Sequence, residues 1–225
     1  MSFYEIVKAY PEGSASASRL SLMAKRLGYE GIIICNKEPD AIFCLPAADK
    51  VRGIEVIPGA EVASPNIRTF RNRVTALRGR FSFLSVLGAT EELVRSACED
   101  PQIDLLIHPS HGRQPLGIAS ARAAEQNQVS IGFDLSPLIR LRGRSRARWM
   151  ESMQRSLELS RKFNLSLIIT SGPRSHLDLR APRDLLALAR VVGFESGEAE
   201  KALMLAGKLV KQNLKRWQGP GVELL

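Results

Sequence analysis

Short apolar runs alternate with longer segments in which apolar residues recur at helical spacing. Brief apolar runs of this kind, bounded by glycine or polar residues, predict buried strands. The runs cover residues 4–7, 31–35, 54–57, 81–87, 103–107, 129–133 and 165–169. The pattern therefore predicts seven strands.

The segments between these strands have the periodicity of amphipathic helices. The predicted helices cover residues 18–27, 91–98, 118–126, 148–162, 182–192 and 196–217. Ser18 is placed to cap the first helix, because a serine side chain accepts hydrogen bonds from free helical N–H groups. Gly28 and Gly193 are placed to end the first and fifth helices, since glycine readily adopts the conformation that follows a helix.

The order of these elements indicates the fold. Strands and helices that alternate through short links predict a parallel sheet, and seven repeats approach the eight of a closed (β/α)₈ barrel. An eighth strand is not apparent, because residues 196–217 have the pattern of one long helix. We therefore expect one α/β domain over residues 1–225, a TIM-like barrel that is incomplete or distorted.

The charge of the chain favours a polyanionic partner. Lysine and arginine number 32 against 23 acidic residues, a formal net charge of +9. Arginine occupies every second position from 140 to 148, and a second arginine-rich stretch runs from residue 68 to residue 80. Because arginine binds phosphate through paired hydrogen bonds and stacks on bases, this bias favours RNA. The expected RNA contacts are Arg140, Arg142, Arg144, Arg146, Arg148, Arg68 and Arg71.

Other classes of protein find little support. The longest apolar runs are far shorter than the roughly 20 residues of a membrane-spanning helix. The N-terminus carries an acid and no long apolar segment, so we expect no secretory signal and a cytoplasmic location. Cys35, Cys44 and Cys98 match neither a CxxC pair nor a disulfide framework, and we expect buried or incidental thiols. P-loop, dinucleotide-binding and serine-hydrolase motifs do not occur.

Residues 171–183 combine three arginines with a histidine and an aspartate in one loop. They follow the seventh strand, and loops at the carboxyl ends of strands carry the function of most α/β barrels. Three further arginines lie there and are also expected RNA contacts: Arg174, Arg180 and Arg183. The residues from 140 to 148 follow the neighbouring sixth strand. Both groups are therefore expected on one rim of the barrel, as a docking surface for RNA or protein.

The order of these residues also resembles a known family. Ile-Thr-Ser-Gly, Ser-His, Asp-Leu-Arg and Ala-Pro-Arg-Asp-Leu, followed by a helix ending in glycine, resemble the signature of protein component 3 of archaeal ribonuclease P, a p30-type subunit. Residues 18–31, including Arg19, Leu20, Leu27 and Tyr29, are similar to the same family's first helix and second strand. The resemblance extends from about residue 4 to residue 193.

The resemblance implies a subunit of the ribonucleoprotein that removes the 5′ leader of precursor tRNA. In that family the RNA subunit carries the chemistry with Mg²⁺, so no catalytic residue and no cofactor are expected in this chain. The expected protein partners are component 2, in a heterotetramer with two copies of each, and the other ribonuclease P proteins. The arginines would neutralise phosphates and so lower the RNA's need for free Mg²⁺. The family's loop matches candidate RNA or partner contacts at Ser171, Arg174, Ser175, His176, Leu179 and Arg180.

A metal-dependent phosphoesterase is one alternative. Carboxylates and imidazoles at one barrel rim can hold a divalent metal that activates water. The candidates are Glu61, His108, His111, Asp134 and His176. The arrangement resembles the polymerase and histidinol phosphatase (PHP) type of barrel, to which component 3 is related in fold. Those enzymes begin with His-x-His after the first strand, where this sequence has Lys-Ala-Tyr at residues 8–10 and cannot hold two metals in the same way.

A protein-assembly module is the other alternative. Such a module would bind its partner protein but would show no salt-sensitive affinity for RNA. A membrane partner is not expected, because neither arginine cluster has the apolar face of an interfacial helix.

Overall fold

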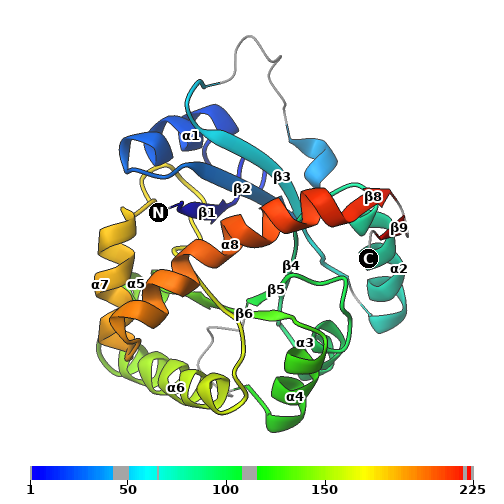
Figure 1. Cartoon of the computed structure of the whole chain (residues 1–225). Helices are drawn as coiled ribbons and strands as arrows, with labels where there is room; N and C mark the ends of the chain where they lie inside the picture. Colours follow the sequence, from blue (N-terminus) through cyan, green and yellow to red (C-terminus); the bar gives the residue numbers. More distant parts are fainter. Residues whose placement is uncertain (1, 43–50, 65, 108–115, 220–221, 224–225) are drawn as a thin grey trace.

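Seven parallel strands curl into a nearly closed barrel (Figure 1). The computed structural model describes residues 2–42, 51–64, 66–107, 116–219 and 222–223. Each strand of the barrel pairs in parallel with the next strand along the chain. The strands are β1 (Tyr4–Val7), β2 (Gly31–Asn36), β3 (Glu55–Glu61), β4 (Leu84–Leu87), β5 (Leu105–Ile107), β6 (Ser130–Asp134) and β7 (Leu167–Thr170). The seven predicted strands and the TIM-like α/β class are thereby confirmed.

Helices surround this sheet (Figure 1). Those that follow the strands are α1 (Ala17–Arg26), α2 (Ile67–Arg78), α3 (Glu91–Cys98), α4 (Ile118–Gln126), α5 (Ser136–Arg140), α6 (Gly143–Lys162) and α7 (Pro182–Val192). A short 3-10 helix, η1 (Pro39–Ala41), follows β2. The long helix α8 (Ser196–Arg216) leads into a small antiparallel pair, β8 (Trp217–Gly219) and β9 (Val222–Glu223). None of the helices in the described ranges is long and apolar enough to cross a membrane.

Three local predictions need correction. Ser16, not Ser18, caps α1, because its side chain accepts a hydrogen bond from the Arg19 N–H group. Residues Ile67–Arg78 form α2, which Asn66 caps. The sequence pattern does not predict this arginine-rich helix. α6 begins at Gly143 instead of residue 148. Three of the alternating arginines therefore lie in the first turns of a helix.

The largest group of buried side chains, which includes Phe70, Phe133 and Trp149, packs the helices against the outside of the sheet. Two of the cysteines, Cys35 and Cys98, are buried as expected, and burial raises the pKa of both thiols to about 12. They therefore stay protonated near neutral pH. Cys44 lies outside the described residues.

α8 closes the amino-terminal end of the barrel. It crosses that end in Figure 1, and its side chains Ala206 and Val210 pack into the barrel interior with Tyr4 of β1. Asn213 donates a hydrogen bond to Asp104 Oδ1 at 2.6 Å, immediately before β5. Because α8 covers the amino ends of the strands, the loops at their carboxyl ends remain free to form a surface.

The buried carboxyl group of Glu5 bridges β1 and β7, the first and last strands. Its Oε1 accepts a hydrogen bond from the Ser171 N–H at 3.0 Å and lies 2.5 Å from the Thr170 hydroxyl oxygen. The Tyr29 hydroxyl oxygen lies 2.9 Å from Glu5 Oε2 and 2.7 Å from the carbonyl oxygen of Arg180. A side chain of β1 thus joins the two ends of the sheet where a closed barrel would have an eighth strand.

This geometry favours a protonated Glu5. A tyrosine hydroxyl has one proton and can donate to one acceptor only. If Tyr29 donates to the Arg180 carbonyl, a protonated Glu5 can donate to the Tyr29 oxygen, and all three groups are satisfied. Burial raises the pKa of Glu5 to about 7, with opposing contributions from its hydrogen bonds to Thr170 and Tyr29. The position therefore stabilises the fold best when the carboxyl group is neutral.

The first prediction concerns the pH dependence of Glu5→Gln. Because the folded pKa is raised, protonation of Glu5 contributes stability that is fully present below about pH 4.5 and is lost as the pH rises through 7. The full loss is on the order of 3 kcal/mol. Glutamine keeps the neutral hydrogen-bonding pattern and cannot ionise, so its unfolding free energy should fall less between pH 5 and pH 8.

Denaturant unfolding at several pH values measures this effect, with the exposed Glu125→Gln as the matched control. The control should retain the pH dependence of the wild type. Identical pH profiles for Glu5→Gln and the wild type would show that Glu5 does not ionise with a raised pKa.

The second prediction concerns two glycines of α8. A Cβ atom at Gly207 would lie 2.3 Å from Cδ2 of the buried Tyr4 ring, whereas one at Gly197 would meet no atom within 4 Å. Gly207→Ala should lower the free energy of unfolding by about 1–3 kcal/mol through overpacking. Gly197→Ala should change it by less than about 1 kcal/mol, in the stabilising direction, because alanine favours a helix. Equal effects at both positions, measured by denaturant unfolding, would contradict the close packing of α8 on β1.

Candidate nucleic-acid interface

The loops that follow β1, β6 and β7 meet at the carboxyl end of the barrel. The Ser14 N–H donates a hydrogen bond to the Arg174 carbonyl oxygen at 2.6 Å, which joins the first and last loops. Arg140 Nη2 lies 3.0 Å from Asp178 Oδ1, an ion pair between α5 and the loop after β7. The loops after the sixth and seventh strands are thus adjacent, as the sequence predicts.

Several of the expected arginines are exposed in these loops or in the first turns of α6. We call them the arginine rim: Arg140, Arg142, Arg144, Arg148 and Arg174. The α-helical start of α6 changes their expected arrangement, because Arg144 and Arg148 are four residues apart and share one face. Arg146 lies on another side of the same turns.

The start of α6 has the electrostatics of an anion site. No acidic residue lies in its first turn, and no side chain caps its first N–H groups. The positive end of the helix dipole would ordinarily favour carboxylates there, yet the chain places Arg142 and Arg144 at this end. Free N–H groups and guanidinium groups together are suited to phosphate oxygens. An unliganded α6 start therefore concentrates positive charge that a bound anion would neutralise.

Besides Arg140, which pairs with Asp178, two more expected contacts are used within the protein. The Arg146 Nε group donates a hydrogen bond to the Leu141 carbonyl oxygen at 2.7 Å. The Arg180 Nη1 group donates to the carbonyl oxygens of Leu177 and Leu179, both at 2.9 Å. These guanidinium groups fix the shape of the loops that carry the rim, and their contact with RNA stays a prediction.

Three other expected arginines are exposed, and two of them lie apart from the arginine rim. Arg68 and Arg71 lie in the first turns of α2, which follows β3, and β3 is separated from β6 by two strands. Arg183 begins α7 with 90% of its side chain exposed, close to the neighbouring Asp184. The structure therefore does not gather all expected RNA contacts into one patch.

The loop residues taken from the family resemblance fall into two groups. Ser171 is 1% exposed and Leu179 is 5% exposed, with Leu179 packed in the core beneath α1. Their burial corrects the expectation of a surface contact, because both side chains face the interior and hold the loop. Ser175 and His176 are partly exposed, so they can take part in a contact. The His176 Nδ1 atom is buried and finds no hydrogen-bond partner among the described residues.

Exposed apolar side chains, which the sequence pattern does not predict, flank the arginine rim. Tyr10 follows β1, Ile139 lies on α5 and Leu177 lies in the loop after β7, with exposures of 63%, 38% and 71%. The available sequence signal is an apolar residue in an otherwise polar loop. Exposed tyrosine and aliphatic residues beside arginines are typical of protein interfaces.

The structure argues against Glu61 as a metal ligand of the alternative phosphoesterase. Its Oε2 lies 2.7 Å from Lys8 Nζ, and Lys37 Nζ lies 3.8 Å from its Oε1. Lys8 also lies 3.2 Å from Glu12 Oε1. Lysine ammonium groups thus neutralise this buried carboxylate, and a divalent metal would have to displace them.

Asp134 and His176, the other candidates that the structure describes, do not form a metal site with Glu61 either. Asp134 Oδ1 accepts a hydrogen bond from the Ser136 N–H at 2.8 Å. Burial raises the pKa of Asp134, and this N–H and the nearby arginine rim oppose the shift. His108 and His111 lie outside the described residues. Within the described ranges, no group of three His, Cys, Asp or Glu side chains could hold a metal ion.

Comparisons with known proteins agree on one family. The family model for RNase P subunit p30 matches residues 2–218. Ribonuclease P protein component 3 of Methanosarcina mazei is 35% identical over 222 residues, which cover 97% of this chain and 92% of that protein. The protein of the same name from Halorubrum lacusprofundi is 33% identical over 221 residues, which cover 95% and 92%.

A solved structure supports the fold. A chain in the cryo-EM structure of archaeal ribonuclease P with mature tRNA matches this chain with a TM-score of 0.80 and 21% identity. The match covers 99% of this chain and 97% of the other. The barrel with α8 across one end is therefore a fold already seen in a solved structure. Given the family model and the full-length relatives above 30% identity, the chain belongs to the RNase P subunit p30 family and is a protein subunit of ribonuclease P.

Proposed function

We propose that this subunit docks the ribonuclease P RNA through its arginine rim, while the RNA itself performs the Mg²⁺-dependent cleavage of precursor tRNA. The main support is the start of α6, where exposed arginines surround uncapped N–H groups and no acid lies in the first turn. Neutralising a phosphate at this position relieves the repulsion among the arginines and satisfies the helix end. The same contacts lower the repulsion between RNA strands and hence the need for free Mg²⁺.

Among the residues that the structure describes, the rim has no group of ligands suited to metal-dependent hydrolysis. A hydrolytic metal site needs open carboxylate or imidazole ligands, and Lys8 neutralises the Glu61 carboxylate at 2.7 Å. The metal-dependent phosphoesterase is therefore not favoured. On this proposal the chain contains no catalytic group and no cofactor of its own.

The apolar side chains beside the arginines favour a protein partner at the edge of the same surface. Tyr10, Ile139 and Leu177 would be covered by component 2, and their burial would supply the apolar centre that stable interfaces need. Binding of component 2 here would leave the arginines at α6 for RNA. We expect a heterotetramer with two copies of each protein, in contact with the other ribonuclease P proteins and with precursor tRNA. The cytoplasmic location stays a prediction.

The prediction for the rim is a loss of salt-sensitive RNA binding in the triple variant Arg140→Gln, Arg142→Gln, Arg144→Gln. Each lost phosphate contact lowers the slope of log affinity against log salt by about 0.7–0.9. The variant should therefore bind the cognate ribonuclease P RNA more weakly, with a slope smaller by about 2–3. Equilibrium binding over a range of salt concentrations measures both quantities.

The matched control replaces three exposed arginines of the barrel flank, Arg95, Arg122 and Arg155, with glutamine. It removes the same three charges from α3, α4 and α6 without touching the rim. If the rim variant and the flank control lose equal affinity and equal slope, the rim is not the docking surface.

A further inference from the structure

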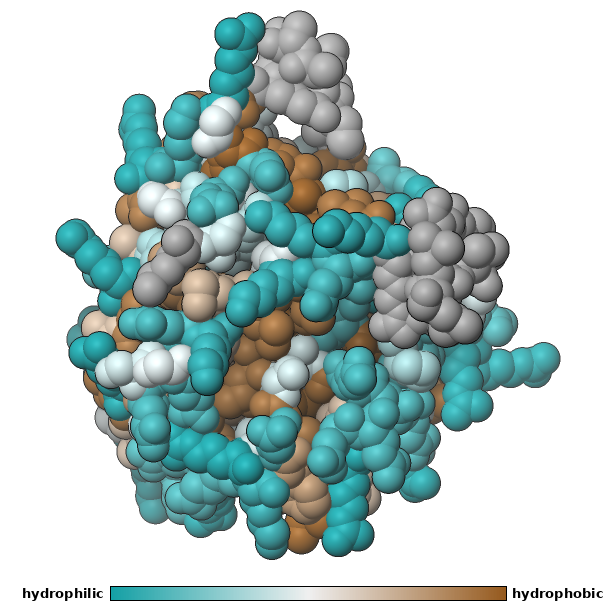
Figure 2. Space-filling model, in the orientation of Figure 1, coloured by the Kyte–Doolittle hydropathy of each residue, from teal (hydrophilic) through white to brown (hydrophobic). Residues whose placement is uncertain are grey.

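The end of the barrel opposite the arginine rim carries a row of lysines. Lys201, Lys208 and Lys215 recur every seven residues along α8, so they lie on one side of the helix. Lys211 lies beside them, and all four are exposed. We call these four residues the lysine face. Figure 2 shows hydrophilic side chains spread over the part of the surface that α8 crosses in Figure 1.

Packing fixes the direction of the lysine face. The opposite side of α8 is buried against the barrel through Ala202, Leu203, Ala206 and Val210. α8 therefore cannot rotate to turn its lysines inward without exposing this apolar side. The chain has no acidic residue between Lys201 and Arg216. An ordinary exposed helix intersperses acids that offset its lysines, whereas this stretch of α8 has no acid of its own.

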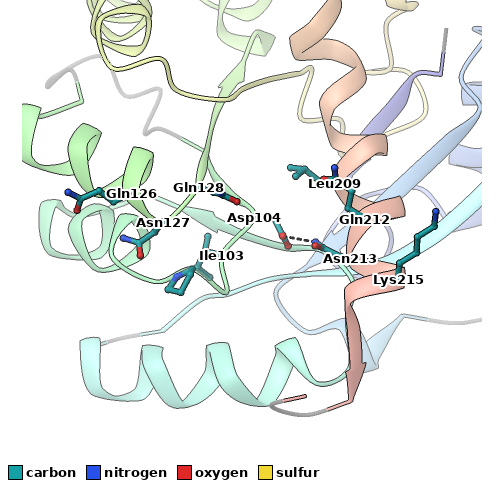
Figure 3. Close-up of a pocket in the computed structure, with 10 residues that line it drawn as sticks. Ile103, Asp104, Gln126, Asn127, Gln128, Leu209, Gln212, Asn213 and Lys215 are labelled. Carbon is teal, nitrogen blue, oxygen red and sulfur yellow. Dashed lines mark hydrogen bonds between the residues drawn. The ribbon is translucent and has the colours of Figure 1, made fainter. Parts of the chain in front are cut away.

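A polar cleft lies beside the carboxyl-terminal half of α8. It has a volume of about 700 Å³. Gln126, Asn127 and Gln128, at the end of α4 and just after it, line one side of the cleft (Figure 3). Gln212, Asn213 and Lys215 of α8 line the other side. The Nδ2 groups of Asn127 and Asn213 already donate to acceptors of the protein. The exposed amides of Gln126, Gln128 and Gln212 can both donate and accept hydrogen bonds, and they match ligand groups that do the same.

Internal bonds hold the floor of the cleft. The Asn213 Nδ2 group donates to Asp104 Oδ1 at 2.6 Å, as Figure 3 shows. The other carboxylate oxygen of Asp104 pairs with Arg78 and accepts a hydrogen bond from the Leu84 N–H at 2.7 Å. The acid in the cleft is therefore compensated by the protein, and it does not cancel the charge of the lysine face. A rigid floor also lowers the entropy lost on binding.

We propose that the lysine face and the adjacent cleft form a second RNA-binding surface. The lysines would contact phosphates, and the amides of the cleft would bond ribose hydroxyls or the edges of unpaired bases. The proposal rests on the proposed function, in that RNA is the partner of the same subunit. With one surface at each end of the barrel, the subunit joins two separate segments of the RNA.

The chemistry distinguishes RNA from other polyanions. An anionic membrane would need an exposed apolar side of α8, and that side is buried in the barrel. An acidic protein segment would offer carboxylates to the lysines and backbone groups to the amides of the cleft, so polyglutamate is the competitor that tests it. RNA carries both the phosphates and the hydroxyl and base groups that the two parts of the surface require.

The test compares the variant Lys201→Gln, Lys208→Gln, Lys215→Gln with the flank control described above. Lys211 is retained, because its ammonium lies 5.3 Å from the centre of the Tyr4 ring and contributes to packing. The probe is the cognate ribonuclease P RNA, and the full chain is used with and without component 2. The lysine variant should lower the salt slope by about 2–3. The flank control should change it little.

Combining the lysine and rim substitutions separates the two surfaces. If both surfaces bind the same RNA, their effects on log affinity should add, because distant sites act independently. Chemical footprinting should show one protected RNA segment lost in the rim variant and a different segment lost in the lysine variant. If the lysine variant equals the flank control in affinity, salt slope and footprint, the lysine face does not bind RNA, whatever the result for the rim variant. A rim variant that matches the flank control overturns the proposed function instead.

The cleft has its own test. Gln126→Ala with Gln212→Ala leaves every charge in place and should weaken RNA binding several-fold without changing the salt slope. Unchanged affinity would remove the cleft from the proposal. Polyglutamate and phosphatidylserine vesicles serve as competitors, and preferential binding of either to the lysine face would overturn RNA as its occupant. Unfolding midpoints equal to that of the wild type show that each variant is folded.

Discussion

Within the described residues the barrel closes without an eighth strand, and this closure determines where α8 and the loops lie. β1 and β7 have no strand between them, and the buried Glu5 carboxyl group joins them through Thr170 and the Ser171 N–H. Burial of a charged carboxylate here would cost free energy, and burial accordingly raises the pKa of Glu5. The contact with the Tyr29 hydroxyl also suits a neutral carboxyl group. The chain that would otherwise supply another strand forms α8, which seals the amino end of the barrel.

This arrangement gives the two ends of the barrel different surfaces. At the carboxyl end the loops remain exposed. The ion pair between Arg140 of the arginine rim and Asp178 joins the loops after β6 and β7. The amino end is covered by α8, which turns its apolar side inward and its lysines outward. After the first strand, Lys8 pairs with the buried carboxylate of Glu61. A divalent metal would have to displace this lysine before it could bind the carboxylate.

The sequence predicts most of the framework, because short apolar runs and helical periodicity are local patterns. It also predicts that arginines follow the sixth and seventh strands, and the structure brings those loops together. It does not predict α2, whose many arginines mask the buried positions of Phe70 and Val74. The role of Glu5 depends on contacts with residues about 165 positions away, and its sequence signal is a single acid in an apolar strand. The burial of Ser171 and Leu179 likewise depends on how the loop folds back, which spacing does not determine.

The most direct test of the account is 5′ leader cleavage of a precursor tRNA at low Mg²⁺, by the cognate ribonuclease P RNA with component 2, in the presence and absence of this chain. If the chain docks the RNA, it should raise the cleavage rate strongly at low Mg²⁺ and less at high Mg²⁺. The two proteins without the RNA should not cleave the precursor tRNA. Cleavage that the chain does not improve, with component 2 shown to be folded, would contradict the docking role. Cleavage by the proteins alone would contradict catalysis by the RNA.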